Sequence, residues 1–174
     1  MLTCPEPSGG ERRALRIIGL GSPFGDDAVG WWVIDQLRAR LPSGGGVEFL
    51  ALDRPGAGLL SFLQGVEAVI LIDAVRGGQP PGTVYRITPE EAERLPAGLS
   101  SHGFGLAEAL RLARALRVRP ARLEIHGIEL GKLTGEGLSP AVEAAAKRLA
   151  DRLLGQLKTA PTDRSPVPPL RQGA

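Results

Sequence analysis

Four side chains of types that bind metal ions or move protons stand at the ends of predicted strands or in the loops that follow them. Asp26 and Asp27 close the segment LRIIGLGSPFGDD, Asp73 closes the apolar run AVILID, and His102 lies in the sequence SSHG. Two carboxylates and an imidazole form an oxygen and nitrogen donor set that suits Ni, Zn, Fe or Mn and leaves coordination positions open. Each residue also has a purely structural interpretation, because Asp and His side chains cap helices and bond backbone amides.

The elements that must position these residues alternate along the chain. Apolar runs and period-two alternation predict strands, and apolar spacing of three or four residues predicts helices. This alternation is typical of a three-layer α/β/α sandwich around a mostly parallel twisted sheet of about five strands. The predicted strands are 14–20, 47–52, 68–75, 83–88 and 123–128, and the predicted helices are 27–41, 57–64, a short one opening at Thr88, one from His102 to about 117, and 139–157.

Two of the predicted strands differ in character. Residues 68–75 are almost continuously apolar, which indicates a strand buried on both faces of a parallel sheet. Residues 83–88 alternate between polar and apolar, which predicts an edge strand with one wet face, and this strand can be antiparallel. Right-handed crossovers allow strands 14–20 and 68–75 to be neighbours. Asp27 and Asp73 would then reach the same carboxyl edge of the sheet, where ligands bind in such folds, and His102 can come over that edge from its loop.

Composition limits the classes of function. The chain has 174 residues, 43% of them hydrophobic, and its net charge of +2 comes from 21 basic and 19 acidic residues that are interspersed. We therefore expect no nucleic-acid partner and no membrane partner. The single cysteine, Cys4, can form no internal disulfide, and Asp73 interrupts the longest apolar run. We predict a cytoplasmic monomer with one domain over residues 14–157, a loose N-terminal tail over 1–13 and a disordered proline-rich tail over 158–174.

A dinucleotide site is the first alternative for the loop after residue 20. Gly19 and Gly21 match two of the three glycines in the dinucleotide-binding fingerprint, but Phe24 occupies the third position. A bulky side chain there hinders close packing of helix on strand, and the two aspartates that follow would repel a pyrophosphate. The loop therefore disfavours nucleotide binding.

Four segments, in consistent order over about residues 14–155, resemble the [NiFe]-hydrogenase maturation proteases. They are GLGSPxGDDxVG at 19–30, ILIDA at 70–74, SHGxGL at 101–106 and GIE at 127–129. The resemblance implies an α/β endopeptidase of the cytoplasm that removes the C-terminal extension of a hydrogenase large-subunit precursor after nickel insertion. Carried over by position, the family's metal-contacting residues fall on Asp27, Asp73 and His102, and Asp26 is a supporting acid. Ser22 stands where the family usually has Asn, which we expect to alter a hydrogen bond in the loop.

The resemblance also implies that nickel is delivered in the precursor rather than held permanently. Nickel can polarise the scissile carbonyl or activate a water molecule, or Asp27 or Asp73 can act as a general base in aspartic-type chemistry. Two rival functions remain open. One is a nickel-sensing assembly chaperone that binds the precursor without cutting it, and the other is an unrelated metal-dependent hydrolase with its own tightly bound metal.

Two further polar features have a structural interpretation. His126 lies in the middle of a predicted strand, where we expect a hydrogen-bonded core histidine rather than a ligand. Arg111, Arg114 and Arg117 fall on the polar side of the helix after His102, and we expect them to form a solvated face.

Overall fold

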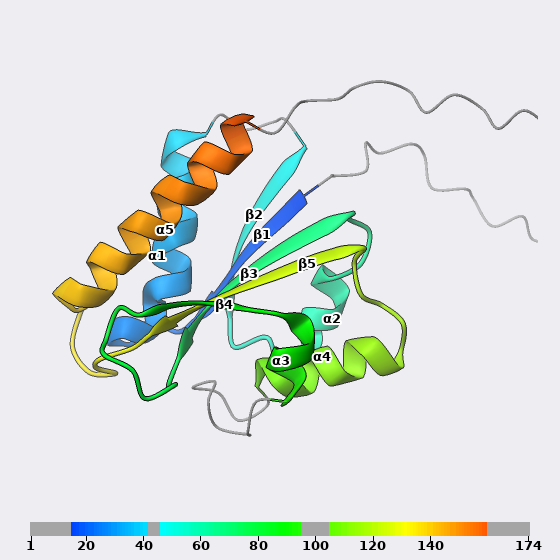
Figure 1. The fold of residues 1–174 in the computed structure, drawn as a ribbon, viewed down its shortest axis with the longest axis horizontal. Helices are drawn as coiled ribbons and strands as arrows, with labels where there is room; N and C mark the ends of the chain where they lie inside the picture. Colours follow the sequence, from blue (N-terminus) through cyan, green and yellow to red (C-terminus); the bar gives the residue numbers. More distant parts are fainter. Residues whose placement is uncertain (1–14, 42–45, 95–104, 160–174) are drawn as a thin grey trace, which may run out of the picture.

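The computed structural model describes residues 15–41, 46–94 and 105–159. Within these ranges the chain forms one five-stranded sheet in the order β2-β1-β3-β5-β4 (Figure 1). Strand β4 runs antiparallel to β5 at one edge, and every other neighbouring pair is parallel. The predicted mixed sheet is therefore confirmed. The strands are β1 (Leu15–Gly21), β2 (Val47–Asp53), β3 (Ala68–Val75), β4 (Val84–Ile87) and β5 (Arg122–Glu129).

Helices cover both faces of the sheet, which makes three layers (Figure 1). Two long helices, α1 (Val29–Arg40) and α5 (Pro140–Thr159), cover one face. Three shorter helices cover the other face: α2 (Leu59–Phe62), α3 (Pro89–Arg94) and α4 (Leu106–Ala115). Two 3₁₀ turns, η1 (Gly25–Ala28) and η2 (Gly56–Gly58), precede α1 and α2.

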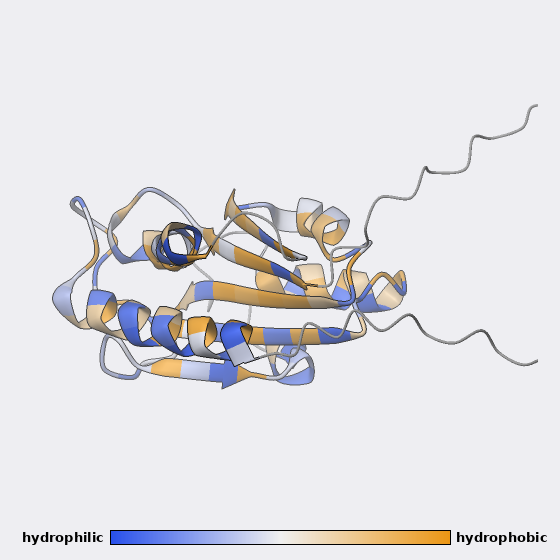
Figure 2. Ribbon diagram, turned by 90° about the horizontal axis from the view of Figure 1, so that it is seen from above, coloured by the Kyte–Doolittle hydropathy of each residue, from blue (hydrophilic) through white to orange (hydrophobic). Residues whose placement is uncertain are grey.

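The strands supply both cores because successive side chains point to opposite faces. Ile17 packs against α1 and α5, whereas its neighbour Ile18 packs in the core beneath α4. In β3, Ile72 likewise packs in the core beneath α1 and α5, and Leu71 packs in the core beneath α4. Figure 2 shows the result as apolar strands flanked by helices with one apolar and one polar side.

The structure differs from prediction at the start of the first helix. The predicted helix 27–41 is split into η1 and α1. Gly25 has a positive φ of 52°, and the backbone N–H of Asp26 donates to the carbonyl of Lys132 at 2.9 Å, a residue far along the chain. The N–H of Asp26 therefore bonds to a distant loop rather than to a carbonyl within the helix, and the regular α-helix begins only at Val29.

The last helix continues to Thr159, two residues past its predicted end. The predicted N-terminal tail lies outside the described residues, as does the predicted C-terminal tail beyond Thr159. In the part of the chain that the structure covers, no helix is both long and apolar enough to cross a bilayer.

Candidate functional site

The first turn of α1 lies directly against the ends of two neighbouring strands. A Cβ atom at Gly30 would lie 2.3 Å from the carbonyl oxygen of Leu20 in β1 and 2.7 Å from that of Ile72 in β3. A Cβ atom at Gly19 would lie 2.2 Å from the Gly30 carbonyl oxygen. The glycines of this loop therefore permit a close helix–strand approach. That approach brings η1, which carries Asp27, to the end of β3, where Asp73 directly follows Ile72.

Asp27 is held in place by the loop that precedes it. Its side chain is buried, with 2% of the residue exposed, and the hydroxyl of Ser22 donates a short hydrogen bond to its carboxylate. The backbone N–H of Ser22 also donates to the Asp27 carbonyl at 3.4 Å. Ser22 therefore anchors the carboxylate directly, at the position where the sequence predicted an altered hydrogen bond.

Asp73 lies in the buried middle strand at the same edge. The residue is 1% exposed and is paired with Gly127 of β5 in the sheet register. It shares its strand face with Val69 and Leu71, whose side chains pack beneath α4. Of the predicted pair of carboxylates, Asp27 thus lies in η1, the turn that follows β1, and Asp73 lies near the end of the neighbouring strand β3. His102 lies outside the described residues, in the segment that joins α3 to α4.

Asp26 has a different environment from its neighbour. It is fully buried and accepts hydrogen bonds from the backbone N–H groups of Gly131 and Lys132, each at 2.8 Å, and from that of Ser139 at 2.5 Å. The Ser139 hydroxyl donates a fourth bond at 2.9 Å. Burial by itself would raise the pKa of Asp26, but these donors outweigh it and hold the pKa below its ordinary value of 3.8. Asp26 therefore ties the β5–α5 loop to the edge that carries Asp27.

Glu129, at the end of β5, is a buried acid whose role the sequence left unassigned. It accepts bonds from the backbone N–H groups of Gly77 at 2.8 Å and Gly78 at 3.1 Å, and from the hydroxyl of Tyr85 at 2.6 Å. Burial raises the pKa of Tyr85 to about 12, and the bond to Glu129 and its charge add to the shift. The GIE segment thus fixes the turn between β3 and β4. In the sequence, the one sign of this role was that Glu129 is an acidic residue directly after a predicted strand.

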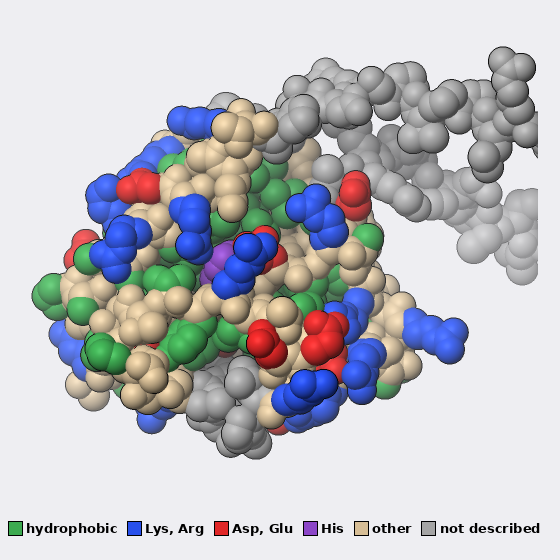
Figure 3. All heavy atoms as spheres, in the orientation of Figure 1, with side chains coloured by type: hydrophobic (Ala, Val, Ile, Leu, Met, Phe, Trp, Pro, Cys, Tyr) green, Lys and Arg blue, Asp and Glu red, His purple; other side chains and the backbone are tan. Residues whose placement is uncertain are grey.

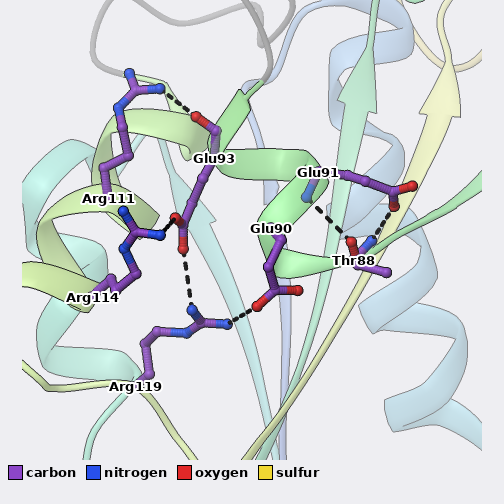
Figure 4. Close-up of polar contacts among 7 residues, drawn as sticks. All are labelled: Thr88, Glu90, Glu91, Glu93, Arg111, Arg114 and Arg119. Atoms are coloured by element: carbon purple, nitrogen blue, oxygen red, sulfur yellow. Dashed lines mark hydrogen bonds and ion pairs between the residues drawn. The ribbon is translucent and has the colours of Figure 1, made fainter.

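The arginines of α4 form a paired network on the face covered by α3 and α4 (Figure 4). Glu93 is 6% exposed, and its carboxylate lies 3.0 Å from Arg114 and 3.1 Å from Arg119. Arg111 donates to the backbone carbonyl of Glu93 at 2.6 Å. Arg111 and Arg114 are exposed, as predicted for a solvated face, and in addition both contact Glu93, which α3 brings against α4.

His126 is a core residue, as predicted. It is 1% exposed, with Nε2 2.8 Å from a carboxylate oxygen of Glu124 and Nδ1 3.5 Å from the guanidinium of Arg152. Burial lowers the pKa of His126 below its ordinary value of 6.5; Glu124 opposes the shift, and Arg152 adds to it. This histidine lies on the α5 face of β5, away from the carboxyl edge.

A wide groove lies at the opposite, amino-terminal edge of the sheet. It encloses about 1220 Å³ and is lined by the first residues of several strands together with parts of α3 and α5, including Leu15, Ala68, Glu90, Arg122, Leu153 and Leu157. On the face of the molecule seen in Figure 1, basic and acidic side chains both occur (Figure 3). Among the described residues, no three His, Cys, Asp or Glu side chains are placed to hold a metal ion.

Comparison with known proteins identifies the family. Residues 33–156 match the family model of the hydrogenase maturation protease HycI. The chain belongs to the hydrogenase maturation protease family. The matched span contains Asp73 and His102 and begins after Asp27. Proteins of this family are processing endopeptidases, and therefore hydrolases.

Relatives of the maturation protease agree along most of the chain. The hydrogenase expression/formation protein HupD of Thiocapsa roseopersicina is 27% identical over 149 residues, which cover 78% of this chain and 67% of that protein. HoxM of Azotobacter vinelandii is 27% identical over 151 residues, covering 79% of this chain and 73% of its own length.

Solved structures show the same fold. The hydrogenase maturating endopeptidase HybD of Escherichia coli superposes with a TM-score of 0.71 at 26% identity, over 83% of this chain and 92% of that one. HybD of Thermococcus kodakarensis gives a TM-score of 0.66 at 26% identity, over 83% and 99% of the two chains. The mixed five-stranded sheet is therefore the fold of a maturation protease.

Proposed function

We propose that this protein removes the C-terminal extension of a [NiFe]-hydrogenase large-subunit precursor after nickel has been inserted. The observation that carries the proposal is the pair of buried carboxylates in a chain of this family: Asp27 in the turn η1 that follows β1, and Asp73 near the end of the neighbouring strand β3. The relatives HupD and HoxM are described as hydrogenase expression/formation proteins, which supports a hydrogenase subunit as the substrate.

In this proposal Asp27, Asp73 and His102 recognise the nickel that the precursor carries. Carboxylate and imidazole donors suit a nickel ion that still has open coordination positions. The fit rests on the two aspartates: both are buried, so a divalent cation beside them would meet little competing water. Affinity for the precursor would then depend on nickel, and cleavage would wait for metal insertion.

The chemical step has two compatible parts. Nickel in the precursor supplies a Lewis acid that polarises the scissile carbonyl or activates a water molecule. A positioned carboxylate can accept the proton of the attacking water. Asp26 is engaged by four donors that fix the β5–α5 loop, so we assign this role to Asp27 or Asp73.

The test is a cleavage assay with a large-subunit precursor prepared with and without nickel. The maturation protease should release one defined C-terminal peptide from the nickel-loaded precursor and none from the nickel-free one, as followed by intact mass. Asp27→Asn, Asp73→Asn and His102→Ala should abolish release. Arg119→Gln, at the distant groove, is the matched control and should cleave normally.

Three other results would each point to a different function. Binding of the nickel-loaded precursor without shortening supports the chaperone alternative. Cleavage that needs no nickel in the precursor but requires a metal retained by the protease supports an independent metal-dependent hydrolase. Full activity of all three site variants would show that the proposed residues are wrong.

A further inference from the structure

One residue at the carboxyl edge has an unusual backbone conformation. Arg54, directly after β2, has a φ of +41°. L-residues with a side chain rarely adopt this left-handed region, and a residue before proline, as Arg54 is, favours extended backbone instead. In the described residues eight positive-φ positions are glycine, and Arg54 and Arg117 are the two that are not. The chain thus keeps a long side chain where its backbone favours glycine.

The backbone of Arg54 is tied to the loop that holds Asp27. Its N–H donates to the carbonyl of Gly21 at 3.3 Å, and Gly21 precedes Ser22, the residue that bonds the Asp27 carboxylate. The indole of Trp31 donates to the carbonyl of Leu52 at 3.0 Å and so holds the end of β2 against α1. Arg54 therefore projects from a fixed position beside the proposed site.

The guanidinium is oriented as well as positioned. Nε of Arg54 lies 2.6 Å from one carboxylate oxygen of Asp53, and a terminal nitrogen lies 3.3 Å from the other. The side chain is 50% exposed, and within the described residues Asp53 is the one group that bonds it. The Asp53 bond and charge raise the pKa of Arg54, and the charge of Asp27 contributes. The bonds to Asp53 therefore leave the donors of the second terminal nitrogen unused on a side chain that is half exposed.

We propose that Arg54 binds the precursor, donating to a carboxylate or main-chain carbonyl oxygen of the segment next to the scissile bond. A planar guanidinium presents paired donors to such oxygens, and an ammonium does not. The proposal rests on the proposed function and adds a substrate contact to it. A side chain retained at an unfavourable backbone position is typical of a functional residue, which supports this assignment.

The test measures kcat and KM for cleavage of the nickel-loaded precursor by Arg54→Gly, Arg54→Lys and Arg117→Gly. Arg54→Gly should raise KM roughly tenfold or more with kcat nearly unchanged, the loss expected for a hydrogen bond to a charged donor. Arg54→Lys should recover part of that loss. Arg117 has a φ of +57° and follows α4 at the opposite edge, so Arg117→Gly relieves the same kind of strain without touching the site. It should leave both constants unchanged.

Each other outcome overturns the inference in a distinguishable way. If Arg54→Gly keeps the wild-type KM while the wild-type protein cleaves normally, Arg54 does not contact the precursor and the proposed function still holds. If Arg54→Gly lowers kcat alone, the guanidinium acts on the site acids rather than on the substrate. If the wild-type protein neither binds nor cleaves the precursor, the proposed function is wrong, and so is the proposed contact between Arg54 and the precursor.

Discussion

The two edges of the sheet use buried charge in opposite ways. At the carboxyl edge, Asp26 takes its hydrogen bonds from neutral donors, three backbone N–H groups and a hydroxyl. Toward the amino edge, the buried acid Glu93 is paired with two guanidinium groups, one of them from the groove-lining Arg119. The negative charge of Glu93 is therefore balanced by two positive charges, whereas that of Asp26 is stabilised by neutral donors alone.

The volume of a groove therefore does not indicate where the active site lies in this fold: the wide groove is at the amino edge, and the proposed site is at the carboxyl edge. Loops at the carboxyl ends of parallel strands converge, because each strand must turn there into a crossover helix. The amino edge collects strand beginnings, and its groove is lined by Arg119, which pairs with Glu93 and Glu90. The following predictions test this difference, from the largest expected effect to the smallest.

The largest effect is expected from the buried acids of the carboxyl edge. Asp73→Asn preserves size and removes charge, so we expect the initial rate of precursor cleavage to fall by about 100-fold or more, the range for loss of a positioned acid–base group. Arg119→Gln alters the groove and should change the rate less than about twofold by the same comparison. An equal fall in the cleavage rate of the two variants would show that the two edges do not differ in function.

The second prediction concerns Asp26 and stability. Asp26→Ala leaves three backbone N–H groups and a hydroxyl without their acceptor, so we expect the free energy of unfolding in urea to fall by about 3 kcal/mol. The exposed Asp151, which pairs with Arg40 and Lys147, provides the control, and Asp151→Ala should move the urea midpoint little.

The same carboxylate sets a pH dependence. The pKa of Asp26 is lower in the folded protein than its ordinary value of 3.8, so the folded state binds fewer protons than the unfolded state as pH falls through that range. Its stabilising contribution is present above pH 3.8 and is lost as pH drops toward the lowered pKa. Urea midpoints at pH 6 and about pH 3 should therefore differ more in the wild-type protein than in Asp26→Ala. An equal difference in both proteins would contradict this.

The third prediction addresses the arginine network. Glu93→Gln keeps the side-chain volume but removes the charge between Arg114 and Arg119, and we expect unfolding to become easier by about 2 kcal/mol. Glu90→Gln alters an exposed acid that meets Arg119 at 3.4 Å and is the matched control, with little change expected. If both variants unfold alike, Glu93 does not hold α3 against α4.

The smallest effect is expected at Tyr85, the chain's single tyrosine. Tyr85→Phe removes one hydrogen bond to Glu129 and should cost about 1 kcal/mol of unfolding free energy. In the native protein the phenol should titrate at about 12, as read by ultraviolet absorbance. Because the folded pKa is raised above 10, the contribution is complete below pH 10 and is lost as pH rises toward 12. Titration of the folded protein at 10 would contradict the hydrogen bond between Tyr85 and Glu129.

The sequence by itself predicted the mixed sheet and the edge at which Asp27 and Asp73 lie. The bounds of β3, residues 68–75, are those predicted, because a long β-branched run between turn residues has few alternatives. The shared edge follows from a topological rule, that neighbouring parallel strands end together. His102 stays a prediction, since it lies outside the described residues.

Tertiary structure decided the partners of each acid. Asp26 and Asp27 are adjacent in the sequence, yet one binds a loop more than a hundred residues away and the other binds Ser22. Glu93 finds its arginines across two helices, and Arg54 takes a conformation that composition would assign to glycine. Periodicity reports which face of an element is buried. Which distant group meets a buried polar atom depends on how the elements pack in three dimensions, and no local pattern encodes that.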